Sequence, residues 1–367
     1  MKRCKRCVLP ETVPGIFFNQ AGICSFCLSY KKEVYFGEEE LRKIIDSIKN
    51  KNSHYDCIVP LSGGRDSCFV LYMAKVVYGL KVLAVNYDNE FRNDQALTNM
   101  HNACKRLNVK LISFCSKINI AKKMVRSGIG AGISKGFCGI VGPLCSACSY
   151  GYKSVVYRAA KTNNVPLILW GESQAEQTLH MRKIPKDESL KQNKSGYLGH
   201  YFRLMYGWFR LLQQFEFPAN SNNTLFTPAL KNKDIKEIRL FDYIVWDRNK
   251  IKETITKELD WEKPIGFIST WRTDCKLHHF MNYCHFKMFG CSKDCFGYCN
   301  MINSGQMDRR DALRQEKKML ATHFDGIEEL LRDEIGLSNK EVATILHLKS
   351  FNLWEGESIC RIRNVSE

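Results

Sequence analysis

A short loop with two adjacent glycines joins a strand-like run of residues to a helix-like run. The loop is Ser62-Gly63-Gly64-Arg65-Asp66-Ser67, which follows the apolar run Cys57–Leu61 and precedes an apolar helical pattern from Cys68 to Tyr78. Glycines let a backbone approach an anion closely, and a helix N-terminus directs free N–H groups and the positive end of its dipole toward that anion. The pattern predicts an oxyanion-binding loop.

The order of strands and helices around this loop indicates the fold class. Strand patterns alternate with helical ones along Lys81–Tyr87, Gln95–Leu107, Lys110–Phe114, Tyr152–Lys161 and Val165–Gly171. Strands separated by helices are typical of a parallel, doubly wound α/β sheet. The loop ending differs from the Gly-Lys-Ser/Thr of a mononucleotide P-loop and from the Gly-x-Gly-x-x-Gly of a dinucleotide fold, so it favours neither.

Composition and pattern divide the chain into four parts. A helical pattern at Glu38–Lys49 predicts a linker helix, and a capping box at Ser338-x-x-Glu341 predicts a helix start in the tail. We expect a four-cysteine zinc module at 1–30, a linker at 31–54, an α/β domain at 55–275 with an insertion at about 181–228, and a mostly helical region at 276–367.

Paired cysteines near the N-terminus predict a metal site. Cys4-x-x-Cys7 and Cys24-x-x-Cys27 are separated by sixteen residues, a spacing typical of tetrahedral zinc. Because all four ligands would be thiolates, no position remains for water, and we expect the Zn²⁺ to be structural.

Further cysteines allow more than one interpretation. Cys145 and Cys148 form a third pair, and Cys275 is a candidate third ligand with them. They could hold an iron-sulfur cluster or a second zinc, or simply pack. The looser series Cys284, Cys291, Cys295 and Cys299 fits either buried thiols or another metal site.

Charge and hydropathy bear on location and partners. The formal net charge of +17 attracts polyanions such as RNA or nucleotide phosphates, although a solvated basic surface explains it equally well. The sequence has neither a signal-peptide pattern at its start nor an apolar run long enough to be a transmembrane segment. We therefore expect a cytoplasmic protein.

The loop resembles the Ser-Gly-Gly-x-Asp-Ser signature of the PP-loop, N-type ATP pyrophosphatase superfamily, which cleaves ATP to AMP and pyrophosphate. The resemblance implies a PP-loop ATP pyrophosphatase domain with ATP at Ser62, Gly63, Gly64, Arg65, Asp66 and Ser67. It also places the adenine beside Val85, Asn86, Tyr87 and Asp88, although Asp88 could instead cap a turn. Asp66, Arg65 and Glu172 are the catalytic candidates: Asp66 for Mg²⁺ or phosphate positioning, Arg65 for a phosphate contact and Glu172 for substrate or base contact. Arg65 and Glu172 could equally be exposed side chains.

A closer resemblance covers most of the chain, to about Leu313. The segments Lys5–Thr12, Gly22–Cys27, Val85–Asn89, Trp170–Glu172 and Trp271–Asp274, together with the loop, resemble the N-acetyl sugar amidotransferase family of lipopolysaccharide O-antigen and pseudaminic acid biosynthesis. The resemblance implies a nucleotide-activated sugar whose acetamido group becomes an acetamidino group, with ATP and Mg²⁺ as cofactors. It also implies a glutaminase subunit that supplies ammonia, alone or with a cyclase-like companion, since no glutaminase nucleophile is visible here.

Two other functions are compatible with the same features. A tRNA thiolation enzyme of the PP-loop class would use the loop, the basic charge and an iron-sulfur cluster at Cys145, Cys148 and Cys275. A non-catalytic module would use only the zinc head and the basic surface. The sugar interpretation needs neither nucleic acid nor iron, which separates it from the first alternative.

Overall fold

The computed structural model describes residues 1–13, 15–49, 53–115, 119–173, 235–322 and 326–348. The expected insertion at about 181–228 lies outside these residues. The protein has one described sheet, which is formed by β1 (Cys57–Pro60), β2 (Val82–Tyr87), β3 (Lys110–Phe114), β4 (Leu167–Trp170) and β5 (Lys236–Arg239). All pairs are parallel and the order is β3-β2-β1-β4-β5.

Strand β1 is the switch point of this sheet. It pairs with β2 on one side, with Ile58 opposite Leu83, and with β4 on the other, with Ile58 opposite Ile168. The chain therefore adds strands first in one direction and then in the other. Ligands of open α/β sheets bind at the carboxyl ends of the strands beside such a point, because the connections there diverge. The loop at Ser62–Ser67 lies at this position.

Helices cover both faces of the sheet. On one face α6 (Gly136–Thr162) packs on β1, β2 and β4, and its Val155, Val156 and Ala159 share a buried cluster with Ile58 and Leu83. The opposite face, which includes Val59 and Ala84, faces α3 (Arg65–Tyr72), α4 (Asp94–Leu107) and α8 (Arg248–Leu259). Successive strand side chains point to opposite faces. The predicted parallel, doubly wound α/β fold is confirmed.

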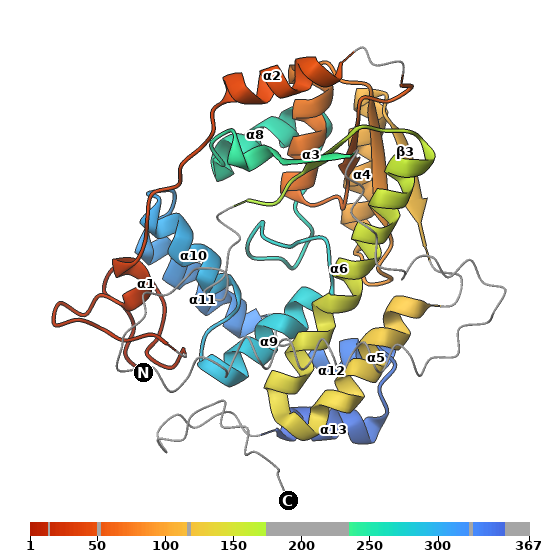
Figure 1. Ribbon diagram of the computed structural model, residues 1–367. Helices are drawn as coiled ribbons and strands as arrows, with labels where there is room; N and C mark the ends of the chain where they lie inside the picture. Colours follow the sequence, from red (N-terminus) through yellow and green to blue (C-terminus); the bar gives the residue numbers. More distant parts are fainter. Residues whose placement is uncertain (14, 50–52, 116–118, 174–234, 323–325, 349–367) are drawn as a thin grey trace, which may run out of the picture.

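The remaining helices lie around this core (Figure 1). α2 (Glu38–Ile48) confirms the predicted linker helix, and the capping box at Ser338 and Glu341 begins α13 (Asn339–His347) as predicted. The described part of the C-terminal region is mostly helical, as expected. The other elements are α1 (Ser25–Leu28), η1 (Met73–Val77), α5 (Ile120–Gly132), η2 (Ile133–Lys135), η6 (Leu240–Asp242), α9 (Leu277–Phe289), α10 (Asp294–Asn303), α11 (Arg309–Thr322), α12 (Ile327–Glu329) and η7 (Leu330–Glu334).

One long helix differs from the sequence expectation. The predicted helix Tyr152–Lys161 is only the end of α6, which begins at Gly136. The first half of α6 contains several glycines, which have low helix propensity. It packs against α5 and α9, so contacts between helices stabilise a conformation that local propensity disfavours.

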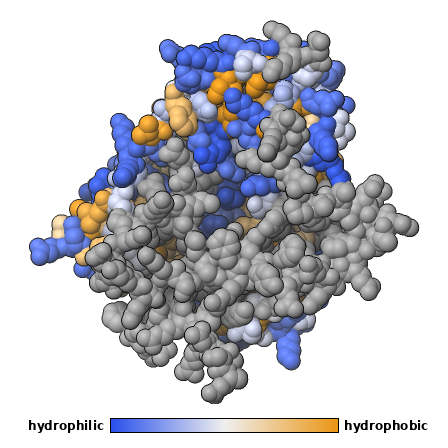
Figure 2. Space-filling model, viewed as in Figure 1, coloured by the Kyte–Doolittle hydropathy of each residue, from blue (hydrophilic) through white to orange (hydrophobic). Residues whose placement is uncertain are grey.

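The N-terminal module lies against the helical region. In Figure 1 it sits beside α10 and α11, away from the sheet. Isolated bridges between Arg3 and Pro10 and between Phe18 and Cys24 shape its two turns. The described part of the face shown in Figure 2 is largely hydrophilic, with small apolar patches. Among the described residues, no helix is both long enough and apolar enough to cross a membrane.

Candidate active site

The two glycines of the loop have different surroundings. Gly63 has φ of +81°, and a Cβ at this position would lie 2.0 Å from the carbonyl oxygen of Ala96. Only glycine fits there. Gly64 has an ordinary φ of −71° and is the N-cap of α3. A Cβ on Gly64 would point instead toward Asp274, 3.5 Å from its Oδ2. Gly63 thus faces α4, and Gly64 faces Asp274.

Hydrogen bonds fix the loop from both sides. The Gly63 carbonyl accepts from Trp261 Nε1 at 3.0 Å and from Asn99 Nδ2 at 3.4 Å. Within the loop, Ser67 Oγ donates to the Gly64 carbonyl at 3.0 Å and lies 3.2 Å from Ser62 Oγ. A loop held in this way keeps its N–H groups oriented before a ligand arrives, which lowers the cost of binding.

Arg65 and Asp66 form a buried ion pair beneath the loop. Arg65 Nε donates to Asp66 Oδ1 at 2.7 Å, and only 2% of the Arg65 side chain is exposed. The guanidinium also donates to Thr270 Oγ1 at 2.8 Å and lies over the ring of Trp246. Arg65 therefore holds neighbouring side chains in place, and a phosphate contact by its guanidinium stays a prediction. Asp66 is 13% exposed, and its metal-binding role also stays a prediction.

A segment distant in sequence covers the loop. Residues 269–275 run between α8 and α9, and within them Thr270 contacts Arg65 while Asp274 approaches Gly64. Asn93 Nδ2 donates to the carbonyl of Thr273, and Cys275 forms an isolated bridge with Arg92. Asp274 is a site residue that the sequence analysis did not select. Asp274 belongs to the segment Trp271–Asp274, which carries part of the family resemblance and could have identified it as a site residue.

The predicted adenine segment consists of the last three residues of β2 and Asp88, which follows it. Val85, Asn86 and Tyr87 are buried, and Asn86 Nδ2 donates to the carbonyl of Leu61, just before the loop. Arg92 donates to Asn86 Oδ1 at 2.9 Å and pairs with Asp88 at 3.2 Å. Asp88 Oδ1 also accepts from the N–H of Glu90, so it caps this turn. An adenine contact here would involve the backbone, and it stays a prediction.

Glu172 lies two residues after the end of β4, across the switch point from β2. A Cβ on the preceding Gly171 would lie 3.5 Å from the carbonyl of Asp66. The Glu172 carboxylate is exposed and accepts from the Tyr152 hydroxyl at 3.3 Å. The structure thus brings Glu172 to the same edge of the sheet as the loop, and its catalytic role stays a prediction.

Three cysteines meet beside this edge. Asn89 Nδ2 donates to the sulfurs of both Cys148 and Cys275 at 3.6 Å. Burial and the neighbouring Cys145 raise the pKa of Cys148 to about 12, and burial and Cys148 raise the pKa of Cys275. Cys145 is exposed. Among the described residues the three sulfurs do not form a group at single-ion spacing. An iron-sulfur cluster, which thiolates hold, or a second zinc at these cysteines stays a prediction, as does simple packing.

The four N-terminal cysteines form a compact buried group. Their sulfurs all lie within 4.8 Å of one another, with Cys7 and Cys24 at 3.6 Å and Cys4 and Cys27 at 4.0 Å. A zinc ion about 2.3 Å from each sulfur would separate tetrahedral ligands by roughly 3.8 Å. Backbone N–H groups of Cys7, Cys24 and Cys27 donate to the sulfurs. The residues fit a structural zinc, although the metal identity stays a prediction.

The later cysteine series lies in the helical region. Cys284, Cys291, Cys295 and Cys299 are all buried. Burial and Cys291 raise the pKa of Cys295. Among the described residues these four form no group at single-ion spacing, which favours the interpretation as packed thiols.

No protein-family model matches the chain. Among curated proteins, an uncharacterized protein of Methanocaldococcus jannaschii is 30% identical over 114 residues, which make up 30% of this chain. The match spans 41% of that relative's length, so the likeness concerns less than half of it.

Three solved structures are similar to this chain. The NMN synthetase of Francisella tularensis is 12% identical with a TM-score of 0.36, over 83% of this chain and 98% of that one. The NH3-dependent NAD synthetase of Campylobacter jejuni is 19% identical with a TM-score of 0.27, over 47% and 74%. The U34-tRNA thiolase NcsA of Methanococcus maripaludis, with its [4Fe-4S] cluster, is 13% identical with a TM-score of 0.32, over 86% and 88%. None of these scores establishes what this chain binds or does.

Proposed function

We propose that the chain is an enzyme that cleaves ATP to AMP and pyrophosphate at the Ser62–Ser67 loop. The observation that carries the proposal is that four separate segments of the chain meet at one place. The loop, the end of β2, the end of β4 and residues 269–275 come from distant parts of the sequence and meet at the switch point of the sheet. These are the places that carry the resemblance to PP-loop enzymes, and an open α/β sheet binds its ligand at this edge.

The proposed position of ATP follows from the loop. Pyrophosphate would lie against the N–H groups between Gly64 and the first turn of α3, where the helix dipole favours an anion. ATP phosphates bind to enzymes of this kind together with Mg²⁺, which neutralises the charge that develops on them. Asp274 faces the loop, and a carboxylate there would repel bare phosphate. We assign Asp274, with Asp66, as a residue able to hold Mg²⁺ at this site.

For the acceptor we propose the acetamido group of a nucleotide-linked N-acetyl sugar. An amide oxygen is a poor leaving group, so ammonia cannot displace it directly. The oxygen would attack the α-phosphate of ATP, with pyrophosphate leaving. Ammonia would then add to the imidate carbon and expel AMP, which leaves an amidine. This activity would serve surface polysaccharide biosynthesis. It is supported by the family resemblance of the segments that meet at the loop.

Ammonia would come from a partner glutaminase. No glutaminase nucleophile is visible in the sequence, and the adenylated intermediate needs ammonia delivered to it without dilution into water. The aromatic and basic residues of Tyr201–Arg210 make this segment our candidate docking surface for the glutaminase, and it lies outside the described residues. The partner is therefore a proposal from chemistry alone.

A product assay tests the proposed function. With ATP, Mg²⁺, an ammonium salt and candidate acetamido sugars, we expect AMP, pyrophosphate and an amidine one mass unit lighter than the sugar. Glutamine should not replace ammonium until a glutaminase is added. Mass spectrometry of the sugar and chromatography of the nucleotides measure both products. ADP as the nucleotide product, or equal use of glutamine by the isolated chain, would contradict the proposal.

One observation favours a second candidate, tRNA thiolation. Asn89 brings Cys148 and Cys275 together beside the proposed ATP site, where a cluster could deliver sulfur to an adenylated base. The same preparation distinguishes the two functions: iron bound by the wild type but not by a Cys148→Ser variant, together with thiolated tRNA, would favour the second candidate. Unchanged amidine formation by that variant would favour the first.

A further inference from the structure

The N-terminal metal module is fastened to the two helices next to it. Asn303, the last residue of α10, donates from Nδ2 to Cys27 Sγ at 3.3 Å. Arg309, the first residue of α11, donates to the carbonyls of Cys7 and Cys4 at 2.9 and 3.0 Å. These contacts reach a metal ligand and the backbone of two others. Loss of the metal would therefore disturb the end of α10 directly.

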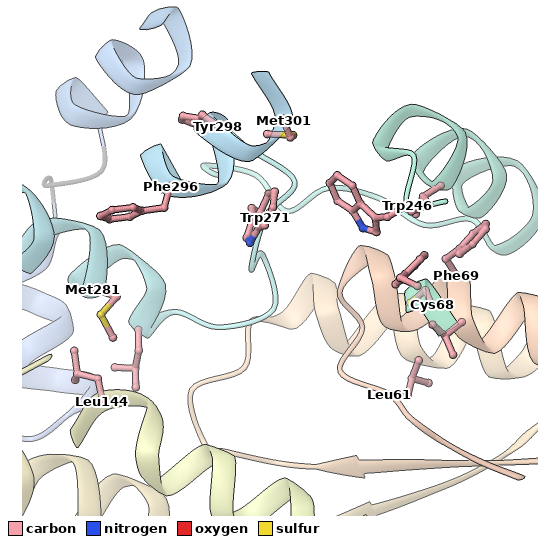
Figure 3. Packing of buried hydrophobic residues seen from close by; sticks show 14 of the residues in the cluster. Leu61, Cys68, Phe69, Leu144, Trp246, Trp271, Met281, Phe296, Tyr298 and Met301 are labelled. Carbon is pink, nitrogen blue, oxygen red and sulfur yellow. The ribbon is translucent and has the colours of Figure 1, made fainter. Parts of the chain in front are cut away.

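The other end of α10 holds residues 269–275, the segment that covers the Ser62–Ser67 loop. This loop is called the phosphate loop below. Asp294, the first residue of α10, accepts from Ser269 Oγ at 3.1 Å and lies 2.8 Å from His278 Nε2. Further along, a Cβ on Gly297 would lie 3.2 Å from the Trp271 ring. Figure 3 shows Trp271 between the α10 side chains, including Phe296 and Tyr298, and Trp246. The ring packs directly on the helix.

Trp271, which packs on α10, also contacts side chains at the phosphate loop. Its ring lies 5.6 Å from that of Trp246, and the Arg65 guanidinium lies 5.8 Å from the Trp271 ring centroid and 4.9 Å from that of Trp246. Arg65 binds Asp66 and Thr270. A cation against aromatic faces in a buried site has a defined position. Each step between the four-cysteine group and the loop is thus a direct contact.

We propose that Trp271 is a positioning residue for ATP and that the four-cysteine centre holds it in position through α10. The inference rests on the proposed ATP site and adds a coupling to it. With metal bound, the module is ordered and both ends of α10 are fixed. Without metal, a segment too small for its own core loses its fold, α10 loses its contacts at Asn303, and Trp271 loses a fixed neighbour. ATP affinity then falls although no ATP contact has been removed.

The coupling has a reciprocal consequence. If metal binding strengthens ATP binding, ATP must strengthen metal binding by the same factor, because the two equilibria are linked. The reciprocal effect can be measured without any turnover.

Two glycines in helix interiors provide a matched test. Gly297→Ala places a methyl group against Trp271, whereas Gly130→Ala on the exposed face of α5 meets only Glu341 Oε1, at 3.7 Å. Both changes raise helix propensity similarly. We expect Gly297→Ala to weaken binding of a nonhydrolysable ATP analogue about tenfold, as measured by calorimetry, with zinc content unchanged. Gly130→Ala should bind the analogue as the wild type does.

A double variant and zinc competition complete the experiment. Trp271→Phe removes part of the ring that the new methyl group meets, so adding Gly297→Ala to it should cost much less than tenfold. In the wild type the analogue should slow zinc capture by a chelator, and in Gly297→Ala that protection should shrink. Analogue affinity equal to wild type in Gly297→Ala, or zinc release that ignores the analogue in the wild type, would overturn the coupling. Absence of analogue binding to the wild type would instead contradict the proposed ATP site.

Discussion

A Gly64→Ala variant is expected to lose AMP and pyrophosphate formation by roughly 10²-fold or more while keeping its fold. Gly64 has φ of −71°, which alanine adopts readily, so the backbone is not strained. The new methyl group would lie 3.3 Å from Ser62 Oγ and 3.5 Å from Asp274, on the side where we place the pyrophosphate. Steady-state AMP release and thermal unfolding of the same preparation measure the two effects.

Gly63→Ala is the contrasting variant. Its methyl group would collide with the Ala96 carbonyl and would require φ of +81°, so we expect loss of stability as well as of activity. Asp66→Ala would be less informative, because Asp66 neutralises buried Arg65 and its removal mixes destabilisation with chemistry. AMP release by Gly64→Ala at near wild-type rates would show that ATP binds elsewhere.

A Cys24→Ser variant is expected to lose the bound zinc and the order of the N-terminal module. Structural zinc sites contribute about 10–16 kcal/mol of binding free energy in small modules, and a serine hydroxyl does not replace a thiolate ligand. Elemental analysis should give near one zinc per wild-type chain and much less per variant. Limited proteolysis should then cut the module first.

Cys115→Ser is the control for this variant. Cys115 is exposed and lies just after β3, far along the chain from the four-cysteine group. We expect it to retain zinc and protease resistance. Equal zinc content in wild type, Cys24→Ser and Cys115→Ser would contradict the assignment of the metal site.

Local patterns in the sequence were sufficient to predict much of the fold. The run Lys110–Phe114 is β3 as expected, and β1, β2 and β4 lie within the predicted runs. Their apolar and β-branched residues favour buried parallel strands. In contrast, β5 has the sequence Lys-Glu-Ile-Arg, a polar edge strand without an apolar run. Its hydrogen bonds with β4 stabilise the strand conformation, which its own residues do not indicate.

The site was predictable only where its residues are neighbours in sequence. The phosphate loop is one continuous segment, and its geometry follows from the strand before it and the helix after it. Asp274 reaches the loop because α10 holds Ser269 at one end of the connecting segment, while Asn93 holds Thr273 at the other. No local pattern encodes these contacts. Likewise, the exposed-side-chain interpretation of Arg65 is wrong: its guanidinium is buried against Trp246, nearly two hundred positions away.

The most direct test of the central claim follows the acetamido oxygen. A candidate acetamido sugar labelled with heavy oxygen in its acetamido group is incubated with the chain, ATP, Mg²⁺ and ammonium, and the AMP is analysed by mass spectrometry. Transfer of the oxygen to the α-phosphate predicts that AMP carries the label, in an amount equal to the amidine formed. Unlabelled AMP, or ADP with inorganic phosphate, would contradict adenylation of the substrate oxygen at this loop.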